Sequence, residues 1–465
     1  MLLRIARIAS AALLAAATAV PRAADAPPAA GVPRLEYEMY QLENGLTVIL
    51  HQDRTAPLIA IHVEYNVGSK DEKPNRTGFA HLYEHLMFQG SEHLPKGEAD
   101  RLLSAAGANG NGGTAEDDTV YWEEGPSGAL DQILYIESER MGFLLRTIDQ
   151  GKLDNQREVV LNELRQRYQM VPYGMAFERL MESLWDPEFP YHWLSIGKER
   201  DIEAATLEDV REFFVHWYGP NNAVLVVAGD FDAATAKAMV QKWFGGIPAR
   251  PTPPRTAPEP RPLVAEKRVT MPDRVQLPRV YLAWQSPRAF AAGDAALDVV
   301  ATLLADGKSA RLTGRLEMRE QIAQGVSAAQ ESRELAGAFL VVATPKPGVT
   351  LGRLEAEIDE ELSRLASEPP SAEELTRAKN KIEAGAVFGL EPLGGFSGRA
   401  AALANYYLRT GDPGFLERDL ERYRAVTAAD VTAAARTYLR KDARVVLEVV
   451  PADPAAQGSG EGGEP

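Results

Sequence analysis

The sequence contains no cysteine among its 465 residues. This absence excludes disulfide bonds, thiolate metal sites, a cysteine nucleophile and the modified cysteine of a lipoprotein anchor. A metal site in this chain must therefore use histidine and carboxylate side chains. All seven histidines lie between His51 and His216, so such a site belongs to the first half of the chain.

The chain also lacks an excess of positive charge. It has 66 acidic and 50 basic side chains, which give a net charge of -16. An acidic surface repels phosphate backbones, so a nucleic acid is not expected as a partner. Hydrophobic residues make up 45% and charged residues 25% of the chain, a balance typical of globular proteins. A chain of this length exceeds one ordinary core, and we expect two or more domains.

Long apolar runs are missing after the first residues, and the run at the start is short. Arg4 and Arg7 precede the apolar stretch from Ile8 to Val20, which is too short for a comfortable membrane span. Small residues follow at two candidate cleavage sites, Ala17-Thr18-Ala19 and Ala24-Asp25-Ala26. This pattern predicts a signal peptide over residues 1–26 and export to the periplasm. The alternative interpretation is an uncleaved N-terminal anchor.

Prolines mark a boundary near the middle of the chain. Residues 247–262 contain seven prolines in sixteen positions, which excludes a helix or a central strand and indicates a semi-rigid linker. We therefore expect an N-terminal domain over residues 27–246 and a C-terminal domain over residues 263–452. The remaining residues, 453–465, are rich in Gly, Pro, Ser and Glu and are predicted to be disordered.

Hydrophobic patterning predicts both strands and helices in the first domain. The expected strands are Gly45–His51, Leu58–Val67 and Ala223–Ala228, and the expected helices are residues 78–90, 128–147, 153–169 and 207–217. A helix capped by Thr and followed by a closing strand occurs in residues 206–227 and again in residues 427–447. We interpret this similarity as a duplication, although coincidence would also produce it.

The segment from Thr77 to Phe88 carries the residues with the clearest chemistry. His81 and His85 are four positions apart, which places both imidazoles on one face of a helix and lets them share one Zn2+. Glu84 lies beside them and can accept a proton from a zinc-activated water that attacks a carbonyl. This order is the inverted His-x-x-Glu-His zinc motif. The alternative is an apolar helix that carries two histidines by coincidence.

A catalytic zinc also needs a third protein ligand and an open coordination position. Glu158 and Glu163, in the predicted helix over residues 153–169, are the candidates. They are five positions apart and point about 140° apart on a helix, so only one of them can serve. Periodicity does not choose between them, and either one could instead pair with a neighbouring arginine in solvent.

The chain resembles the pitrilysin/insulin-degrading-enzyme family, which includes the mitochondrial processing peptidases and their bacterial relatives. The resemblance extends from about residue 36 to 450 and is carried by residues 77–88 and by residues 157–163. It implies that Glu163, rather than Glu158, is the third zinc ligand. Many relatives have a glutamate seven positions before this ligand, where this chain has Gln156, so the support of the site is expected to differ.

Two further segments bear on substrate binding. One is similar to the family's edge strand, which pairs with the substrate backbone, although by itself it would be interpreted as a Gly-rich loop. Its residues are Asn111, Gly112, Gly113 and Thr114. The family's second half supplies an Arg and a Tyr that stabilise the oxyanion. This chain has Glu317 and Gln324 at the matching positions, and a shift of two residues would offer Arg319 but no Tyr.

The resemblance implies an α+β fold with two similar domains, each an antiparallel-rich sheet packed with helices, that together form half of a clam-shell. The linker is expected to let the domains and a partner close around a chamber. The implied function is a zinc-dependent endopeptidase, with one Zn2+ per chain, that cuts short or unfolded peptides. Loss of the Arg and Tyr implies a homologous partner subunit without zinc, and a homodimer or monomer is the alternative. Two other functions stay open: a peptide-binding or assembly subunit with a structural zinc, and a zinc hydrolase acting on another bond.

Overall fold

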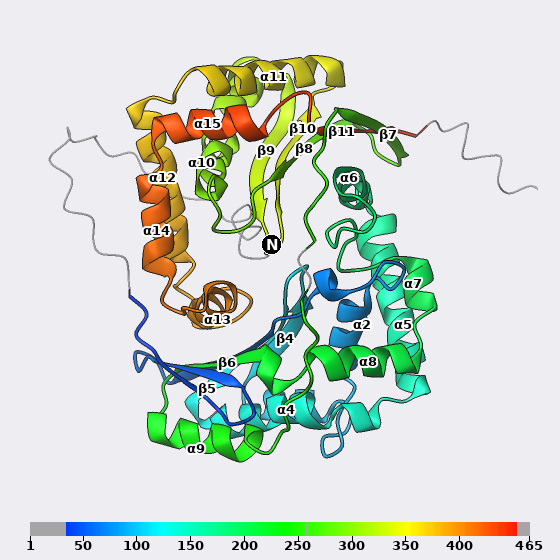
Figure 1. The fold of residues 1–465 in the computed structure, drawn as a ribbon, viewed down its shortest axis with the longest axis vertical. Helices are drawn as coiled ribbons and strands as arrows, with labels where there is room; N and C mark the ends of the chain where they lie inside the picture. Colours follow the sequence, from blue (N-terminus) through cyan, green and yellow to red (C-terminus); the bar gives the residue numbers. More distant parts are fainter. Residues whose placement is uncertain (1–33, 256–257, 453–465) are drawn as a thin grey trace, which may run out of the picture.

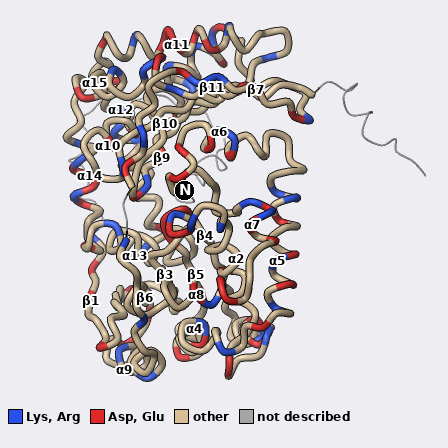
Figure 2. The backbone as a smooth tube through the Cα atoms, turned by 45° about the vertical axis from the view of Figure 1, so that its right-hand side comes forward, with Lys and Arg blue, Asp and Glu red and all other residues tan. Residues whose placement is uncertain are grey.

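The computed structural model describes residues 34–255 and 258–452, which form two sheets surrounded by helices (Figure 1). The expected signal peptide (1–26) and the expected disordered tail (453–465) lie outside the described residues. Within the described ranges, no helix has both the length and the apolar character that crossing a bilayer requires. Acidic and basic positions are interspersed along both halves (Figure 2).

The first sheet has six strands in the order β1-β2-β6-β3-β5-β4. Its neighbours are antiparallel except for β2 and β6, which are parallel. The strands are β1 (Glu38–Gln41), β2 (Thr47–Gln52), β3 (Leu58–Tyr65), β4 (Asn109–Thr114), β5 (Thr119–Pro126) and β6 (Ala223–Gly229). The α-helices of this half are α2 (Phe79–Leu86), α3 (Glu98–Ala105), α4 (Leu130–Phe143), α5 (Gln150–Leu164), α6 (Ala176–Leu184), α7 (Glu199–Glu203), α8 (Leu207–Trp217) and α9 (Ala233–Phe244).

The second sheet has five strands in the order β7-β11-β8-β10-β9. Here too one pair, β7 and β11, is parallel, and the others are antiparallel. The strands are β7 (Lys267–Asp273), β8 (Arg279–Ser286), β9 (Ala323–Ser332), β10 (Gly337–Pro345) and β11 (Val445–Pro451). The α-helices are α10 (Asp294–Ala305), α11 (Leu351–Ser367), α12 (Ala372–Phe388), α13 (Arg399–Thr410), α14 (Leu416–Ala425) and α15 (Ala428–Tyr438).

Apart from β1, the two sheets have the same topology. In each half the first strand pairs in parallel with the last, and the third strand lies at the edge beside the fourth. The predicted repeat also holds at its helices, because Thr206 caps α8, Thr427 caps α15, and each helix is followed by a closing strand. These features confirm the predicted α+β fold with two similar sheets.

One helix from each half packs against the sheet of the other half. Helix α6 packs against β8 and β11, whereas α13 packs against β2, β3 and β6 (Figure 1). The α13 side chains Ala400, Leu403 and Ala404 share one buried cluster with Ile49 and Val226 of the first sheet. A hinge motion about residues 247–262 would expose both shared cores, so this packing does not favour closure of one half upon the other.

The element predictions for the first half are confirmed to within a few residues at the ends. The expected helix over residues 153–169 is α5, which ends at Leu164 and continues as the π-helix η5 (Arg165–Gln169). The described part of residues 247–262 contains no helix or strand. The boundaries of the two domains stay a prediction, because α6 and α13 cross between the two sheets.

Candidate functional site

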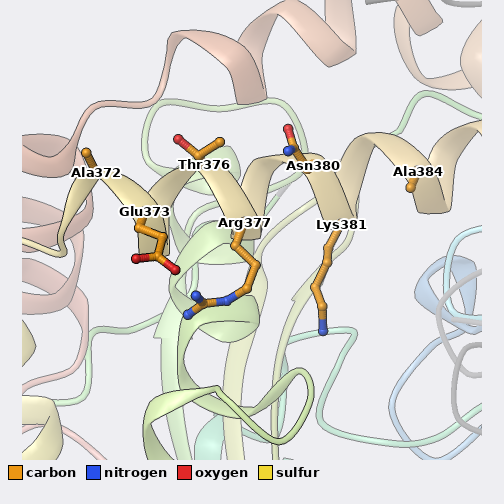
Figure 3. A pocket seen from close by; sticks show the side chains of 7 residues that line it. All are labelled: Ala372, Glu373, Thr376, Arg377, Asn380, Lys381 and Ala384. Atoms are coloured by element: carbon orange, nitrogen blue, oxygen red, sulfur yellow. The ribbon is translucent and has the colours of Figure 1, made fainter. Parts of the chain in front are cut away.

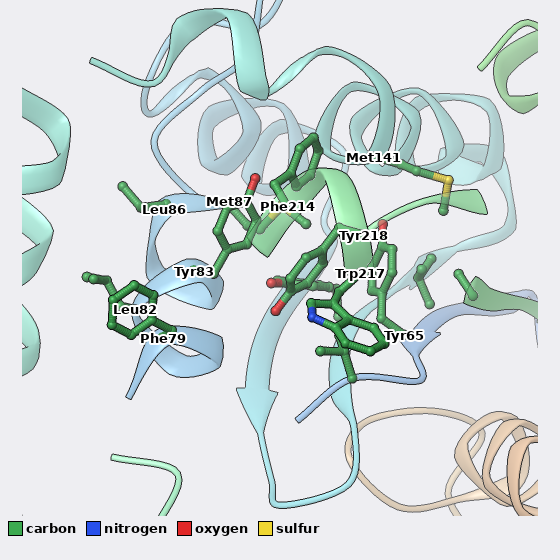
Figure 4. Packing of buried hydrophobic residues seen from close by; sticks show 14 of the residues in the cluster. Tyr65, Phe79, Leu82, Tyr83, Leu86, Met87, Met141, Phe214, Trp217 and Tyr218 are labelled. Carbon is green, nitrogen blue, oxygen red and sulfur yellow. The ribbon is translucent and has the colours of Figure 1, made fainter. Parts of the chain in front are cut away.

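Helix α2 carries the His-x-x-Glu-His segment and has one strongly apolar face. Tyr83 on that face stacks on Phe214 of α8 and on Tyr218, with ring centroids 5.1 and 4.5 Å apart (Figure 4). Aromatic stacking with burial fixes the rotation of the helix about its axis. The other face is therefore left to the polar side chains of the motif.

The start of α2 is held by a buried carboxylate. Gly78, with φ 85°, precedes the helix in a left-handed conformation that favours glycine. The Glu72 carboxylate accepts hydrogen bonds from the backbone N–H groups of Gly78 and Ala80, at 3.0 and 2.8 Å, and from the indole N–H of Trp193, at 3.0 Å. A carboxylate at this position satisfies free N–H groups and complements the helix dipole. Glu72 was not predicted from the sequence, because a cap from outside the first turn has no local pattern.

The two imidazoles of α2 converge on Glu163 of α5. Nε2 of His85 lies 3.3 Å from Oε2 of Glu163, and Nε2 of His81 lies 3.7 Å from the same oxygen. The ligand atoms of the three side chains all lie within 4.8 Å of one another, the single such group found in residues 34–255 and 258–452. Two imidazole nitrogens and one carboxylate oxygen form a donor set that suits Zn2+ and leaves a fourth position open.

Burial and mutual contact set the protonation of this group. Burial, with the neighbouring His85, lowers the pKa of His81 to about 4. Burial also acts to lower the pKa of His85, but the hydrogen bond with Glu163 and nearby negative charge raise it above its ordinary value. The same hydrogen bond lowers the pKa of Glu163. At neutral pH His81 is therefore neutral and Glu163 ionised, which are the forms that bind a metal.

Glu84 lies next to the group without being one of its three members. It is 7% exposed, and one carboxylate oxygen accepts a hydrogen bond of 2.8 Å from Oγ1 of Thr114. Burial raises the pKa of Glu84, and the Thr114 hydrogen bond opposes this shift. A buried carboxylate with a raised pKa is suited to accept and return a proton. The contact with Thr114 was not predicted, because no local pattern links residues 30 positions apart.

The rotation of α5 separates the two candidates Glu158 and Glu163 in space. Glu163 faces α2, whereas Glu158 is exposed. The second oxygen of Glu163, Oε1, lies 2.6 Å from Nη1 of Arg167, one turn further along the chain. Gln156 is 5% exposed, and its neutral side chain is among the groups that raise the pKa of His85.

The glycine-rich segment forms β4, which is the outer strand of the first sheet. A Cβ atom added to Gly112 would lie 3.1 Å from the Phe88 ring, and one added to Gly113 would lie 2.7 Å from the Phe396 ring. The glycines therefore fit between aromatic rings on the two faces of the strand. Asn111 is exposed, and Thr114 ends the strand beside Glu84. Within the described chain, no strand pairs with the outer edge of β4.

The two positions at which the family has Arg and Tyr lie in the second half. Oε1 of Glu317 accepts a hydrogen bond of 2.8 Å from the backbone N–H of Val326 at the edge strand β9. Gln324 lies on the same strand and is exposed. Neither side chain is a cation or a phenol that could bind an oxyanion.

Two hollows lie outside the group formed by His81, His85 and Glu163. An open groove of about 610 Å³ follows α12 and is lined by Ala372, Glu373, Thr376, Arg377, Asn380, Lys381 and Ala384 (Figure 3). None of the site residues lines it. A smaller cavity of about 90 Å³ adjoins the end of β4, and Gly113, Thr114 and Arg409 are among its lining residues.

The chain matches two family descriptions. Residues 47–188 match "Insulinase (Peptidase family M16)", and residues 204–382 match "Peptidase M16 inactive domain". The first match contains both histidines and both glutamates of the site. The second match begins in the first half and ends in α12, and it contains none of His81, His85 and Glu163.

Similar proteins cover nearly the whole described chain. The zinc protease PqqE of Helicobacter pylori is 29% identical over 411 residues, which are 87% of this chain and 90% of that protein. The crystal structure of a protease from Helicobacter pylori has a TM-score of 0.82 at 26% identity and covers 90% of this chain and 100% of that chain. The periplasmic protease PqqL from Escherichia coli shares the fold, with a TM-score of 0.74 at 20% identity. The match covers 92% of this chain and 50% of that chain.

Proposed function

Because the chain belongs to the insulinase (peptidase M16) family, we propose that it is a zinc-dependent endopeptidase that hydrolyses short or unfolded peptides. The observation that carries this proposal is the convergence of His81, His85 and Glu163, with Glu84 beside them. The name zinc protease, given to the relative from Helicobacter pylori, supports it. A structural zinc would not require a buried carboxylate next to its ligands.

The proposed zinc ligands are His81, His85 and Glu163. The donor set and its partial exposure fit a catalytic ion, since the side chains are 11%, 20% and 16% exposed. When bound, zinc supplies Lewis-acid activation of water and of the substrate carbonyl. Arg167 holds the outer oxygen of Glu163 and orients the carboxylate toward the histidines. Gln156 supports His85 in the same way, as a neutral neighbour.

Glu84 is the proposed general base. Its carboxylate accepts the proton of the attacking water and then gives it to the leaving amine of the cleaved peptide bond. Its burial favours the protonated form that the second transfer requires. Thr114 holds one carboxylate oxygen and leaves the other free for the proton.

The outer edge of β4 is the proposed binding place for the substrate backbone. A peptide in extended conformation would add to the sheet as a further strand and form main-chain hydrogen bonds. The proposed contacts are Asn111, Gly112, Gly113 and Thr114. Such binding requires an unfolded segment, which accounts for the proposed preference for short or unfolded peptides.

We further propose that the active assembly contains a second, homologous subunit that supplies an Arg and a Tyr in a closed chamber. At the position of the Arg, Glu317 carries the opposite charge and accepts a hydrogen bond from the backbone of β9. At the position of the Tyr, Gln324 has an amide in place of the phenol. A homodimer is the alternative. Residues 1–26 direct the proposed export to the periplasm, the compartment named for the Escherichia coli relative.

The test is hydrolysis of an internally quenched peptide by the purified chain loaded with one equivalent of Zn2+. We expect internal cleavage that stops with a chelator and returns with Zn2+. If the chain alone is slow, a homologous subunit that copurifies with it should restore the rate. Peptide binding by fluorescence anisotropy without cleavage, even in that complex, would instead identify a peptide-binding subunit. Cleavage of envelope amides but not of peptides would identify a zinc hydrolase that acts on another bond.

A further inference from the structure

The turn that connects β4 to β5 (residues 115–118) is joined to the second half of the chain. One oxygen of Asp117 accepts a hydrogen bond of 2.6 Å from the hydroxyl of Tyr191, and the other accepts one of 2.9 Å from the backbone N–H of Glu334. The Tyr191 hydroxyl in turn accepts a hydrogen bond of 3.0 Å from the backbone N–H of Leu335. Glu334 and Leu335 lie between β9 and β10, the hairpin equivalent to β4 and β5. The tips of two equivalent hairpins are therefore joined.

Arginine and lysine side chains complete this junction. Nη1 of Arg409, on α13, lies 2.9 Å from Asp117, and Nη2 lies 2.9 Å from Asp118. Nζ of Lys70 donates a hydrogen bond of 2.8 Å to the backbone carbonyl of Asp117. Burial acts to raise the pKa of Asp117, but Arg409 and Lys70 hold it well below its usual range. Asp117 is 5% exposed, so removal of Arg409 would leave a buried charge without its main partner.

The joined turn begins next to Thr114, the donor to Glu84. A backbone hydrogen bond of 2.9 Å from Ala115 to Asp118 closes the turn, and the backbone N–H of Ser69 donates to the Ala115 carbonyl at 3.2 Å. The turn is thus fixed on both sides, and Thr114 has little freedom to move away from α2. The second half contains no histidine, and it nevertheless reaches the site through this turn.

We propose that the second half of the chain positions the base: Arg409 and the β9–β10 turn hold the β4–β5 turn, and Thr114 transmits this constraint to Glu84. The inference rests on the proposed function, because it assigns a role in that reaction. Thr114, Asp117, Tyr191 and Arg409 are positioning residues, since they act through Glu84. A base displaced by about 1 Å loses on the order of 100-fold in rate, so the constraint matters for turnover.

The first test compares Thr114→Val with Thr114→Ser. Valine keeps the shape and removes the hydroxyl, whereas serine keeps the donor. We expect Thr114→Val to lower kcat by about 10- to 100-fold with KM changed less than about twofold, and Thr114→Ser to retain most of kcat. Both variants should bind one Zn2+. Equal loss in both variants, or a loss confined to KM, would overturn the role of the hydroxyl.

The second test asks whether the junction acts through Thr114. Arg409→Met and the milder Tyr191→Phe should each lower kcat, and each should add little to the loss in a Thr114→Val background. A matched control is Arg422→Met, which removes a comparable pair of 3.0 Å with the buried Asp294. This control should leave kcat within about twofold, as expected for a site without a shared partner. Losses that multiply in the double variants, or an equal loss in the control, would contradict the proposal.

A measurement without catalysis separates this proposal from the proposed function. Hydrogen exchange of the β4 amides (residues 109–114) should be faster in Tyr191→Phe and Arg409→Met than in wild type, and unchanged in Arg422→Met. If the wild-type chain never cleaves peptides, the proposed function fails, while exchange still reports whether the junction holds β4. Unchanged exchange in Tyr191→Phe and Arg409→Met would overturn the inference even if the wild-type enzyme is active.

Discussion

Replacement of Glu84 by glutamine is a sharp test of the proposed chemistry, because it changes one proton acceptor and little else. Glutamine has nearly the same shape, and its amide oxygen can accept the hydrogen bond that Thr114 donates at 2.8 Å. Glu84 does not belong to the group formed by His81, His85 and Glu163, so metal binding should persist. The amide, however, cannot accept a proton from water at neutral pH.

The expected magnitude follows from the role and the burial of the side chain. General-base catalysis contributes about 10²- to 10⁴-fold, so kcat of Glu84→Gln should fall by at least about 100-fold. Burial disfavours the charged carboxylate, which is why the pKa of Glu84 is raised. A neutral amide relieves this penalty, and the free energy of unfolding should change by less than about 1 kcal/mol.

Three measurements on the same preparation test whether Glu84 is the general base: kcat with the quenched peptide, zinc content by elemental analysis, and urea unfolding. We expect a large loss of kcat with one Zn2+ per chain and unchanged unfolding. A kcat within about threefold of wild type, with zinc and fold retained, would remove Glu84 from the mechanism. A threefold decrease in kcat is far smaller than the contribution that a general base makes.

Three further predictions concern the support of the site and of the second half. Glu163→Gln should weaken zinc binding by more than about 100-fold, while Glu158→Gln, an exposed change on the same helix, should leave the zinc Kd unchanged; competition with a chromophoric chelator measures both. Gln156→Glu should tighten zinc binding by about tenfold, because it adds a charge beside His85, and it should destabilise the zinc-free protein in urea. Burial acts to raise the pKa of Glu374, but its hydrogen bonds with Arg311 lower it from 4.5 to about 2. A lowered pKa stabilises the fold above pH 4.5 and this stabilisation is lost as the pH falls toward 2, so Glu374→Gln should lower the unfolding free energy by about 1–2 kcal/mol at pH 7 and by less at pH 3.5.

Local patterns in the sequence were sufficient for much of the first half and for the repeated Thr-capped helix of the second half. The helix that carries His81 and His85, the buried strand β3 and the Thr-capped helices α8 and α15 all depend on spacing within one element. Periodicity left Glu158 and Glu163 open, because the direction in which α5 faces is set by its packing against α2. The family resemblance supplied that choice.

Contacts between distant segments had no comparable signal. The exchange of α6 and α13 between the two sheets depends on which apolar faces meet, and many amphipathic helices would satisfy the same pattern. The pair of Arg409 with Asp117 joins residues 292 positions apart, and no local pattern links them. The hydrogen bond from Thr114 to Glu84 also joins distant positions, so it could not be predicted from a local pattern.

The claim that one metal ion joins α2 to α5 is tested most directly by zinc-edge anomalous diffraction from crystals grown with one equivalent of Zn2+. We expect one anomalous peak per chain, about 2.0–2.2 Å from Nε2 of His81, Nε2 of His85 and one oxygen of Glu163. A peak elsewhere, or no peak between these three side chains at full zinc occupancy of the protein in solution, would contradict it.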